Sequence, residues 1–154
     1  MTGNYDQFQI LMSRLNLPVQ NISTEITIHS VTEKEEYNQL LDLFFGIFPD
    51  EIDSEKGMDL RDLPVDSIKG EGIYLAKLDQ KSVGFLVTGI INKVGYISYI
   101  GVVEKYRSQG IATALLKRFK QYLNDNNVEK VRCKVNEENK KTLGYIKYLS
   151  FKKL

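Results

Sequence analysis

The chain has 154 residues, an apolar fraction of 42% and a formal net charge of +1, which fits one globular domain. Its apolar runs are too short to span a bilayer, and residues 1–20 lack the uninterrupted apolar stretch of a signal peptide. The single cysteine, Cys133, excludes an internal disulfide and a cysteine-clustered zinc site. We therefore expect a cytoplasmic protein that uses neither a membrane nor a metal.

Charge is divided unevenly along the chain. Residues 1–80 carry 15 acidic and 6 basic side chains, whereas residues 81–154 carry 5 acidic and 15 basic ones. An uneven solvated surface would explain this division. So would an anionic ligand on the second half and a cationic one on the first. Composition alone leaves both explanations open.

The first third of the chain predicts a helix, a strand and a second helix. Residues 5–16 carry apolar side chains at helical spacing, which predicts a helical extension in residues 1–22, ahead of a main domain in 23–154. Residues 25–31 alternate like a half-buried strand. Thr32 and Glu35 have the spacing of a capping box and open a helix that we expect to end before Pro49.

The remainder predicts a sheet followed by two helices. Residues 49–66 are acidic and bracketed by prolines, so we expect a loop. Three strand-like runs follow, separated by short connections, and predict an antiparallel meander over 72–78, 82–91 and 95–103. An amphipathic helix follows Gly110, then a strand over 128–135 and a helix over about 139–149. The strand alternation makes Cys133 a packed thiol rather than a nucleophile.

The junction between the third meander strand and the next helix has the features of an anion site. The first amides of a helix lack intrahelical acceptors, and the helix dipole favours negative charge beside them. Gly110 allows a phosphate to approach the backbone, Ala112 leaves space, and Arg107 supplies a charged donor. Neither the Gly-x-x-x-x-Gly-Lys-Ser/Thr motif nor the Gly-x-Gly-x-x-Gly motif occurs. The order of strand, loop, helix, strand and helix favours an anion site over an ordinary helix start.

With this order of elements the chain resembles the GNAT superfamily of acetyl-CoA-dependent N-acetyltransferases. Residues 107–112 (RSQGIA) match the family's Arg/Gln-x-x-Gly-x-Gly/Ala pyrophosphate signature, and residues 100–102 resemble the strand end that contacts the pantetheine arm. In that family the strand splays from its neighbour at a bulge, which suits Gly101. The resemblance implies an α/β (α+β) fold with a mixed, mostly antiparallel twisted sheet flanked by helices. It also implies acetyl-CoA as co-substrate, bound by Ile100, Val102, Val103, Arg107, Ser108, Gln109, Gly110, Ile111, Ala112, Thr113, Asn139 and Tyr145.

The last helix resembles the family's Asn-x-x-Ala helix, but with departures. The common tyrosine position, seven residues after Asn139, holds Ile146, whereas Tyr145 lies six residues after it, as in the histone-acetylating branch. Ser150 replaces the usual glycine before Phe151. The family's C-terminal hairpin is shortened here, which would expose the sheet edge beyond strand 128–135. We expect a homodimer to cover that edge, unless segment 5–16 covers it instead.

The resemblance implies that a primary amine attacks the acetyl thioester directly, through a tetrahedral intermediate. Two catalytic groups follow from it: the backbone N–H of Val102 as oxyanion donor, and the Tyr145 phenol as the acid that protonates the leaving thiolate. Alternatively, the Tyr145 ring only packs on the cofactor.

The sequence selects no general base and no single acceptor amine. Tyr96 stands where the histone-acetylating branch has a glutamate, and His29 lies far from the motif in sequence. A water chain could end at Glu71, Asp79 or an acid of residues 50–66. The seven acids of that segment favour a cationic small-molecule or peptide amine, unless they are only a solvated loop.

Two other functions compete with an enzyme. One is a non-catalytic module on the same scaffold that senses acetyl-CoA or binds a partner. The other is nucleic-acid binding by the basic second half, but its bases are interleaved with apolar core positions and no nucleic-acid motif is present. We therefore expect an N-acetyltransferase that binds no nucleic acid.

Overall fold

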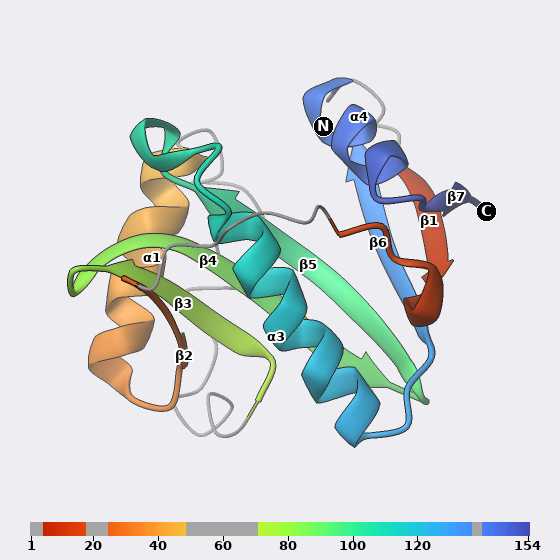
Figure 1. The fold of residues 1–154 in the computed structure, drawn as a ribbon, viewed down its shortest axis with the longest axis horizontal. Coiled ribbons are helices and arrows are strands. Elements are labelled where there is room, and N and C mark those ends of the chain that lie inside the picture. Colours follow the sequence, from red (N-terminus) through yellow and green to blue (C-terminus); the bar gives the residue numbers. More distant parts are fainter. Residues whose placement is uncertain (1–4, 18–24, 49–70, 137–139) are drawn as a thin grey trace.

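A computed structural model describes residues 5–17, 25–48, 71–136 and 140–154. These residues form a seven-stranded, mostly antiparallel sheet in the order β2-β3-β4-β5-β6-β1-β7, with helices on both faces (Figure 1). The predicted mixed α/β fold is confirmed. Among the described residues, no helix is long and apolar enough to cross a membrane. The strands are β1 (Tyr5–Leu11), β2 (Ile26–Ser30), β3 (Ile73–Leu78), β4 (Lys81–Ile91), β5 (Val94–Val102), β6 (Lys130–Asn136) and β7 (Lys152–Lys153).

Three α-helices and two short 3-10 turns complete the described chain. The helices are α1 (Lys34–Ile47), α3 (Ile111–Asp125) and α4 (Lys140–Tyr148), and the turns are η1 (Met12–Arg14) and η4 (Glu104–Tyr106). The predicted meander is confirmed as β3, β4 and β5. Its two connections each place two consecutive residues at positive φ, at 79–80 and 92–93. Positive φ at both central residues is the twist that a two-residue hairpin requires.

The N-terminal segment is a strand, so the prediction of a helix over residues 5–16 was wrong. β1 pairs antiparallel with β6 along its whole length, from Tyr5 opposite Asn136 to Leu11 opposite Lys130. The buried side chains of β1 and of the residue after it alternate, with Phe8 2%, Ile10 5% and Met12 3% exposed. The segment carries both a helical and a two-residue apolar period, and pairing with β6 selects the second. The predicted extension is therefore, where it is described, part of the main sheet.

β1 also covers the sheet edge that we expected to be exposed beyond β6. It lies between β6 and the short β7, which pairs with Phe8 and Gln9 of β1. The alternative expectation, that the N-terminal segment covers this edge, is confirmed. The reason for expecting a homodimer there is thereby removed.

The start of α1 differs from the predicted capping box. The N-cap is Glu33, which makes no side-chain cap hydrogen bond, so the prediction that Thr32 and Glu35 form a capping box was wrong. Instead, the N–H of Thr32 donates to the Glu36 carboxylate at 3.4 Å. The helix ends at Ile47, before Pro49 as predicted.

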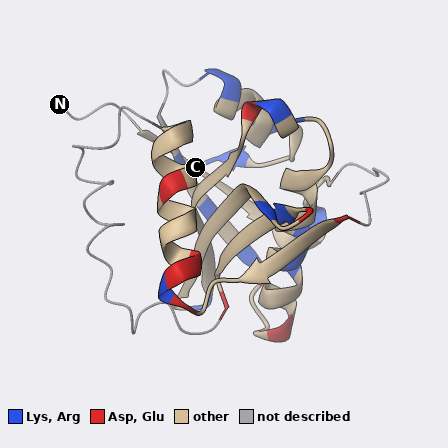
Figure 2. Cartoon of the chain, turned by 90° about the vertical axis from the view of Figure 1, so that its left-hand side faces the viewer, with Lys and Arg blue, Asp and Glu red and all other residues tan. Residues whose placement is uncertain are grey.

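Two apolar clusters lie on the two faces of the sheet. On one face α1 covers a cluster that includes Leu40, Phe44, Leu75 and Phe85. On the other face α3 and α4 cover the larger cluster, which also takes in residues of β1, β4 and β6. Figure 2 looks toward α1 and shows its acidic positions, whereas α3 and α4 carry more basic residues than acidic ones. Among the described helices, the acidic side chains of α1 and the basic side chains of α3 and α4 therefore lie on different faces of the sheet.

β5 and β6 begin together and then separate. Their parallel pairing runs from Val94 opposite Lys130 to Ile97 opposite Cys133, whereas β5 continues to Val102 and β6 to Asn136. Beyond the last pair the two strands diverge, and α4 lies beside the far end of β6 (Figure 1). The splay expected from the family resemblance is therefore present between these two strands.

The bulge that accompanies this splay is at Ser98 and not at Gly101. Thr88 of β4 pairs with Ile97 and Val87 pairs with Tyr99, so Ser98 is the extra residue. Gly101 instead lies opposite Phe85, and a Cβ added to it would meet the Phe85 ring at 2.8 Å. Gly101 is therefore required by the close approach of an aromatic ring, which is a different reason from the predicted one.

Candidate active site

One side of the opening between β5 and β6 is formed by the end of β5. The N–H of Val103 donates to the C=O of Val83 in the neighbouring β4 at 2.9 Å. Because successive N–H groups of a strand point to opposite sides, the N–H of Val102 points away from β4. It therefore points to the side from which β6 has diverged. A backbone donor faces the opening at this position.

Arg107 joins the following loop to the end of β5. Its Nε donates to the C=O of Val102 at 3.1 Å. This bond uses one of the five N–H donors of an exposed guanidinium, so four others remain for a ligand. Next to it, the ammonium groups of Lys81 and Lys105 lie 5.7 and 5.3 Å from the centroid of the Tyr106 ring. Positive charge therefore borders this loop.

α3 begins in a backbone conformation that suits glycine. Gly110, the N-cap, has φ 83 and ψ 9, in the left-handed region, and makes no side-chain cap hydrogen bond. The first helical hydrogen bond runs from the N–H of Ala114 to the C=O of Gly110 at 2.9 Å. The amides of residues 111–113 therefore precede the first intrahelical bond and lack an acceptor within the helix. They present partial positive charge to the loop.

The predicted cofactor residues from 100 to 113 thus lie together, in three different environments. Arg107, Ser108 and Gln109 are exposed in the loop. Ile111 and Thr113 are buried, at 2% and 4% exposure, so only their amides can reach a ligand. Intermediate exposure is found for Ile100, Val102, Val103 and Ala112.

The other side of the opening is formed by β6 and α4. Tyr145 of α4 is half-buried and packs against the apolar cluster beneath α3, and the neighbouring Ile146 is part of that cluster, at 6% exposure. Burial, with a smaller contribution from Tyr148, raises the pKa of Tyr145 to about 12. The phenol therefore stays protonated at neutral pH. Asn139, the other predicted cofactor residue near this helix, lies outside the described residues.

Two of the candidates for a general base are far from the opening. His29 is exposed on β2, the strand at the opposite edge of the sheet, where its Nε2 lies 2.9 Å from Thr27 Oγ1. Asp79 is exposed in the turn between β3 and β4. The acids of residues 50–66 lie outside the described residues. Neither described candidate borders the opening.

Glu71, the third candidate, forms an ion pair with Arg118 of α3. Its carboxylate accepts hydrogen bonds from Arg118 Nη2 at 2.6 Å, the Tyr74 hydroxyl at 2.7 Å and the Ser30 hydroxyl at 3.2 Å. Burial alone would raise its pKa, but these hydrogen bonds and the charge of Arg118 together lower the pKa of Glu71 below its usual value. A carboxylate stabilised in this way is a weak proton acceptor.

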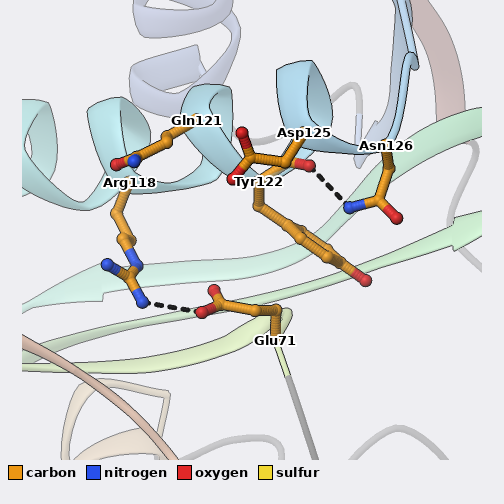
Figure 3. Close-up of a pocket in the computed structure, with 6 residues that line it drawn as sticks. All are labelled: Glu71, Arg118, Gln121, Tyr122, Asp125 and Asn126. Atoms are coloured by element: carbon orange, nitrogen blue, oxygen red, sulfur yellow. Dashed lines mark hydrogen bonds and ion pairs between the residues drawn. The ribbon is translucent and has the colours of Figure 1, made fainter.

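A cavity of about 410 Å³ opens beside this ion pair (Figure 3). Arg118 reaches across it to Glu71, and Asn126 Nδ2 donates to the C=O of Tyr122 at 2.8 Å on its wall. The α3 residues that line it begin at Arg118, well beyond residues 107–113. The cavity is therefore separate from the opening between β5 and β6. It is lined by Glu71, Arg118, Gln121, Tyr122, Asp125 and Asn126.

Cys133 has the environment of a core residue. It is 6% exposed within the cluster beneath α3, and burial raises the pKa of its thiol to about 12. The thiolate that a nucleophile needs is therefore disfavoured, in agreement with the prediction of a packed thiol. Within residues 5–17, 25–48, 71–136 and 140–154, no group of three or more His, Cys, Asp or Glu side chains could hold a metal ion.

The family is established by the sequence. The profile of the Acetyltransferase (GNAT) family matches residues 36–151, which is most of the chain. The chain therefore belongs to the GNAT family of acetyltransferases.

An individual relative matches over a shorter stretch. The N-alpha-acetyltransferase of Saccharolobus solfataricus is 30% identical over 98 residues, which cover 55% of this chain and 59% of that protein. The match thus spans less than two thirds of the archaeal relative.

Two solved structures share the fold. The first is the aminoglycoside acetyltransferase meta-AAC0020 from an uncultured soil metagenomic sample, in complex with sisomicin, with a TM-score of 0.64 and 20% identity over 79% of this chain and 84% of that one. The second is AAC(6')-Iy in complex with the bisubstrate analogue CoA-S-monomethyl-acetylneamine, with a TM-score of 0.66 and 16% identity over 84% and 92% of the two chains. At these identities the likeness is one of fold.

Proposed function

We propose that this protein is an N-acetyltransferase that moves the acetyl group of acetyl-CoA to a primary amine. The observation that carries the proposal is the arrangement at the end of β5. A backbone N–H that faces the opening, an arginine and the unbonded first amides of α3 follow one another within residues 102–113. Family membership and the CoA-derived ligand of AAC(6')-Iy support the same assignment.

The pyrophosphate of acetyl-CoA would lie at the start of α3. The amides of residues 108–113 would donate to its oxygens, and Arg107 would add charge-assisted hydrogen bonds. The left-handed Gly110 has no Cβ, so a phosphate can approach its backbone closely. The pantetheine arm would run along residues 100–103 into the opening between β5 and β6. The residues present therefore fit acetyl-CoA.

The chemistry then needs three groups at the thioester. The neutral amine forms a C–N bond with the acetyl carbon, the C–S bond breaks, and the thiolate receives a proton while the amine loses one. We assign the N–H of Val102 as the donor to the oxyanion and the hydroxyl of Tyr145 as the proton donor to sulfur. Since His29 and Asp79 lie away from the opening and Glu71 is held by Arg118, we assign proton removal from the amine to water.

The acceptor is proposed to be a cationic amine. The named substrates of relatives differ, because the archaeal relative is an N-alpha-acetyltransferase and two structures of similar fold are aminoglycoside acetyltransferases. Residues 49–66 carry seven acids against Lys56 and Arg61, and this favours positive charge on the acceptor. The cytoplasmic location expected from the sequence stays a prediction.

A screen of amine classes tests this function. Acetyl-CoA is incubated with peptides bearing free N-termini, aminoglycosides, polyamines and neutral amines, and the release of free thiol is followed. We expect amine-dependent release, with the highest kcat/KM at low salt for an amine of two or more positive charges. Saturable acetyl-CoA binding with no thiol release for any class would instead identify a non-catalytic acetyl-CoA module. Higher kcat/KM for neutral amines would contradict the cationic acceptor alone.

A further inference from the structure

The far half of β6 depends on β1. After Cys133, β6 has separated from β5, and among the described strands its pairing partner over residues 134–136 is β1 alone. In this stretch Gln7 lies opposite Lys134 and Asp6 opposite Val135. The carboxylate of Asp6 also lies 3.4 Å from the ammonium group of Lys153 in β7. The N-terminal segment therefore supports the far half of β6, which forms the side of the opening opposite β5.

The same segment reaches the helix that carries Tyr145. The backbone N–H of Asn16 donates to the C=O of Leu149 at 3.1 Å, and its side-chain Nδ2 donates to the C=O of Tyr148 at 3.2 Å. Carbonyl groups at the end of a helix have no intrahelical donor, so Asn16 supplies two donors from a distant part of the chain. One turn earlier, the C=O of Tyr145 accepts from the N–H of Leu149 at 3.0 Å. Asn16 is thus linked to Tyr145 through a single helical turn.

α4 is a helix whose position must come from such contacts. It has nine residues, and an isolated helix of this length is marginal in water. Its buried face, which includes Ile146, packs on a cluster against which Leu15 and Leu17 also pack. Residues 5–17 therefore share an apolar cluster with α4 and also bind the carbonyl groups at its end.

We propose that residues 5–17 are a positioning element of the active site, in which Asn16 holds the end of α4 so that the Tyr145 hydroxyl lies in line with the opening. This segment precedes residues 36–151, the part of the chain that matches the family profile. The inference rests on the proposed function, in which Tyr145 protonates the leaving thiolate. Asn16 itself touches neither substrate.

The structure supplies a matched control for Asn16. Asn126 makes the same type of bond at the end of α3, from its Nδ2 to the C=O of Tyr122 at 2.8 Å, and it too is exposed. Asn16→Ala and Asn126→Ala each remove one amide donor from a helix C-terminus. Asn16→Asp and Asn126→Asp additionally place a carboxylate against the carbonyl oxygens and the negative end of the helix dipole. The two pairs should lower the melting temperature by similar amounts.

The test compares turnover and acetyl-CoA affinity in these four variants. We expect Asn16→Ala to lower kcat about threefold and Asn16→Asp about tenfold, because small displacements of a catalytic group are costly, with the Kd for CoA within about twofold of the parent. Both Asn126 variants should keep the parent kcat. Equal kcat in the Asn16 and Asn126 variants would overturn the inference. Absence of turnover in the parent would instead refute the proposed function, which separates the two failures.

A double-mutant cycle distinguishes positioning of Tyr145 from a general loss of stability. If Asn16 acts through the Tyr145 hydroxyl, Asn16→Asp should have almost no effect on kcat in a Tyr145→Phe background. If the asparagine has only a structural role, the same roughly tenfold loss should persist in that background, and the inference is then wrong. Circular dichroism and calorimetric CoA binding verify that every variant is folded.

Discussion

The two sides of the opening between β5 and β6 are built in different ways. The β5 side consists of backbone amides, a left-handed glycine and one arginine, all within residues 102–113. On the β6 side the proposed proton donor, Tyr145, belongs to α4, and Asn16 donates to the C=O of Tyr148 at the end of that helix, 132 positions further along the chain. A site made of consecutive backbone leaves a short motif in the sequence. A site assembled from distant segments leaves none.

The largest expected effect concerns the β6 side. Tyr145→Phe keeps the ring and its packing but removes the hydroxyl, so a proton donor to the thiolate should be lost. We expect kcat to fall about 10²-fold, within the usual range for general acid–base groups, with the Kd for CoA unchanged. Tyr148→Phe, one turn away and 54% exposed, is the control and should keep the parent kcat. Turnover of Tyr145→Phe within about twofold of the parent would leave Tyr145 as a packing residue.

A smaller effect is expected on the β5 side, and it should appear in affinity and not in turnover. Arg107→Ala removes the guanidinium that borders the start of α3 and its bond to the Val102 carbonyl. Loss of a hydrogen bond to a charged group costs about 1.5–3 kcal/mol, so acetyl-CoA should bind about tenfold more weakly by calorimetry. Lys105→Ala, which removes an equal charge two residues away, should change the Kd less than about threefold. Equal losses in the two variants would reduce Arg107 to a contributor of general positive charge.

The smallest expected effect concerns pH, because kcat should not change over the pH range in which an ordinary tyrosine begins to titrate. Burial raises the pKa of Tyr145 to about 12, so its neutral form is favoured in the folded protein and is retained as the pH rises past the ordinary value near 10. With an acceptor amine whose own pKa lies well below 8, so that it is neutral throughout, kcat should stay level between about pH 8 and pH 10 and fall only as the pH approaches 12. A fall centred below about pH 10 that disappears in Tyr145→Phe would show that the phenol is not held in this buried state.

The sequence predicted the middle of the chain well, because local rules dominate there. The meander carries two-residue turns and alternating strands, and the period changes sharply at Gly110, where α3 begins. The helix start at Gly110 could be predicted for the same reason, since it depends only on neighbouring residues. These elements need no information about distant segments.

The elements that were mispredicted depend on tertiary contacts. Residues 5–16 fit a helix and a strand equally well, and only the availability of the β6 edge decides between them. The bulge falls on Ser98 and not on Gly101, because the register between β4 and β5 shifts there and Phe85 occupies the space above Gly101. Asn16 has no recognisable motif, since it becomes a helix cap only when the chain's two ends come together.

The most direct measurement for the central claim is calorimetric titration of acetyl-CoA into the parent and two valine variants. Gly110→Val forces a β-branched residue into the left-handed conformation at the start of α3, whereas Gly89→Val makes the same change in β4, where a new Cβ meets nothing within 4 Å. We predict saturable binding to the parent and to Gly89→Val, and binding at least about tenfold weaker, or about 1.4 kcal/mol, to Gly110→Val. Unchanged affinity in a folded Gly110→Val variant would contradict a cofactor site at residues 107–113.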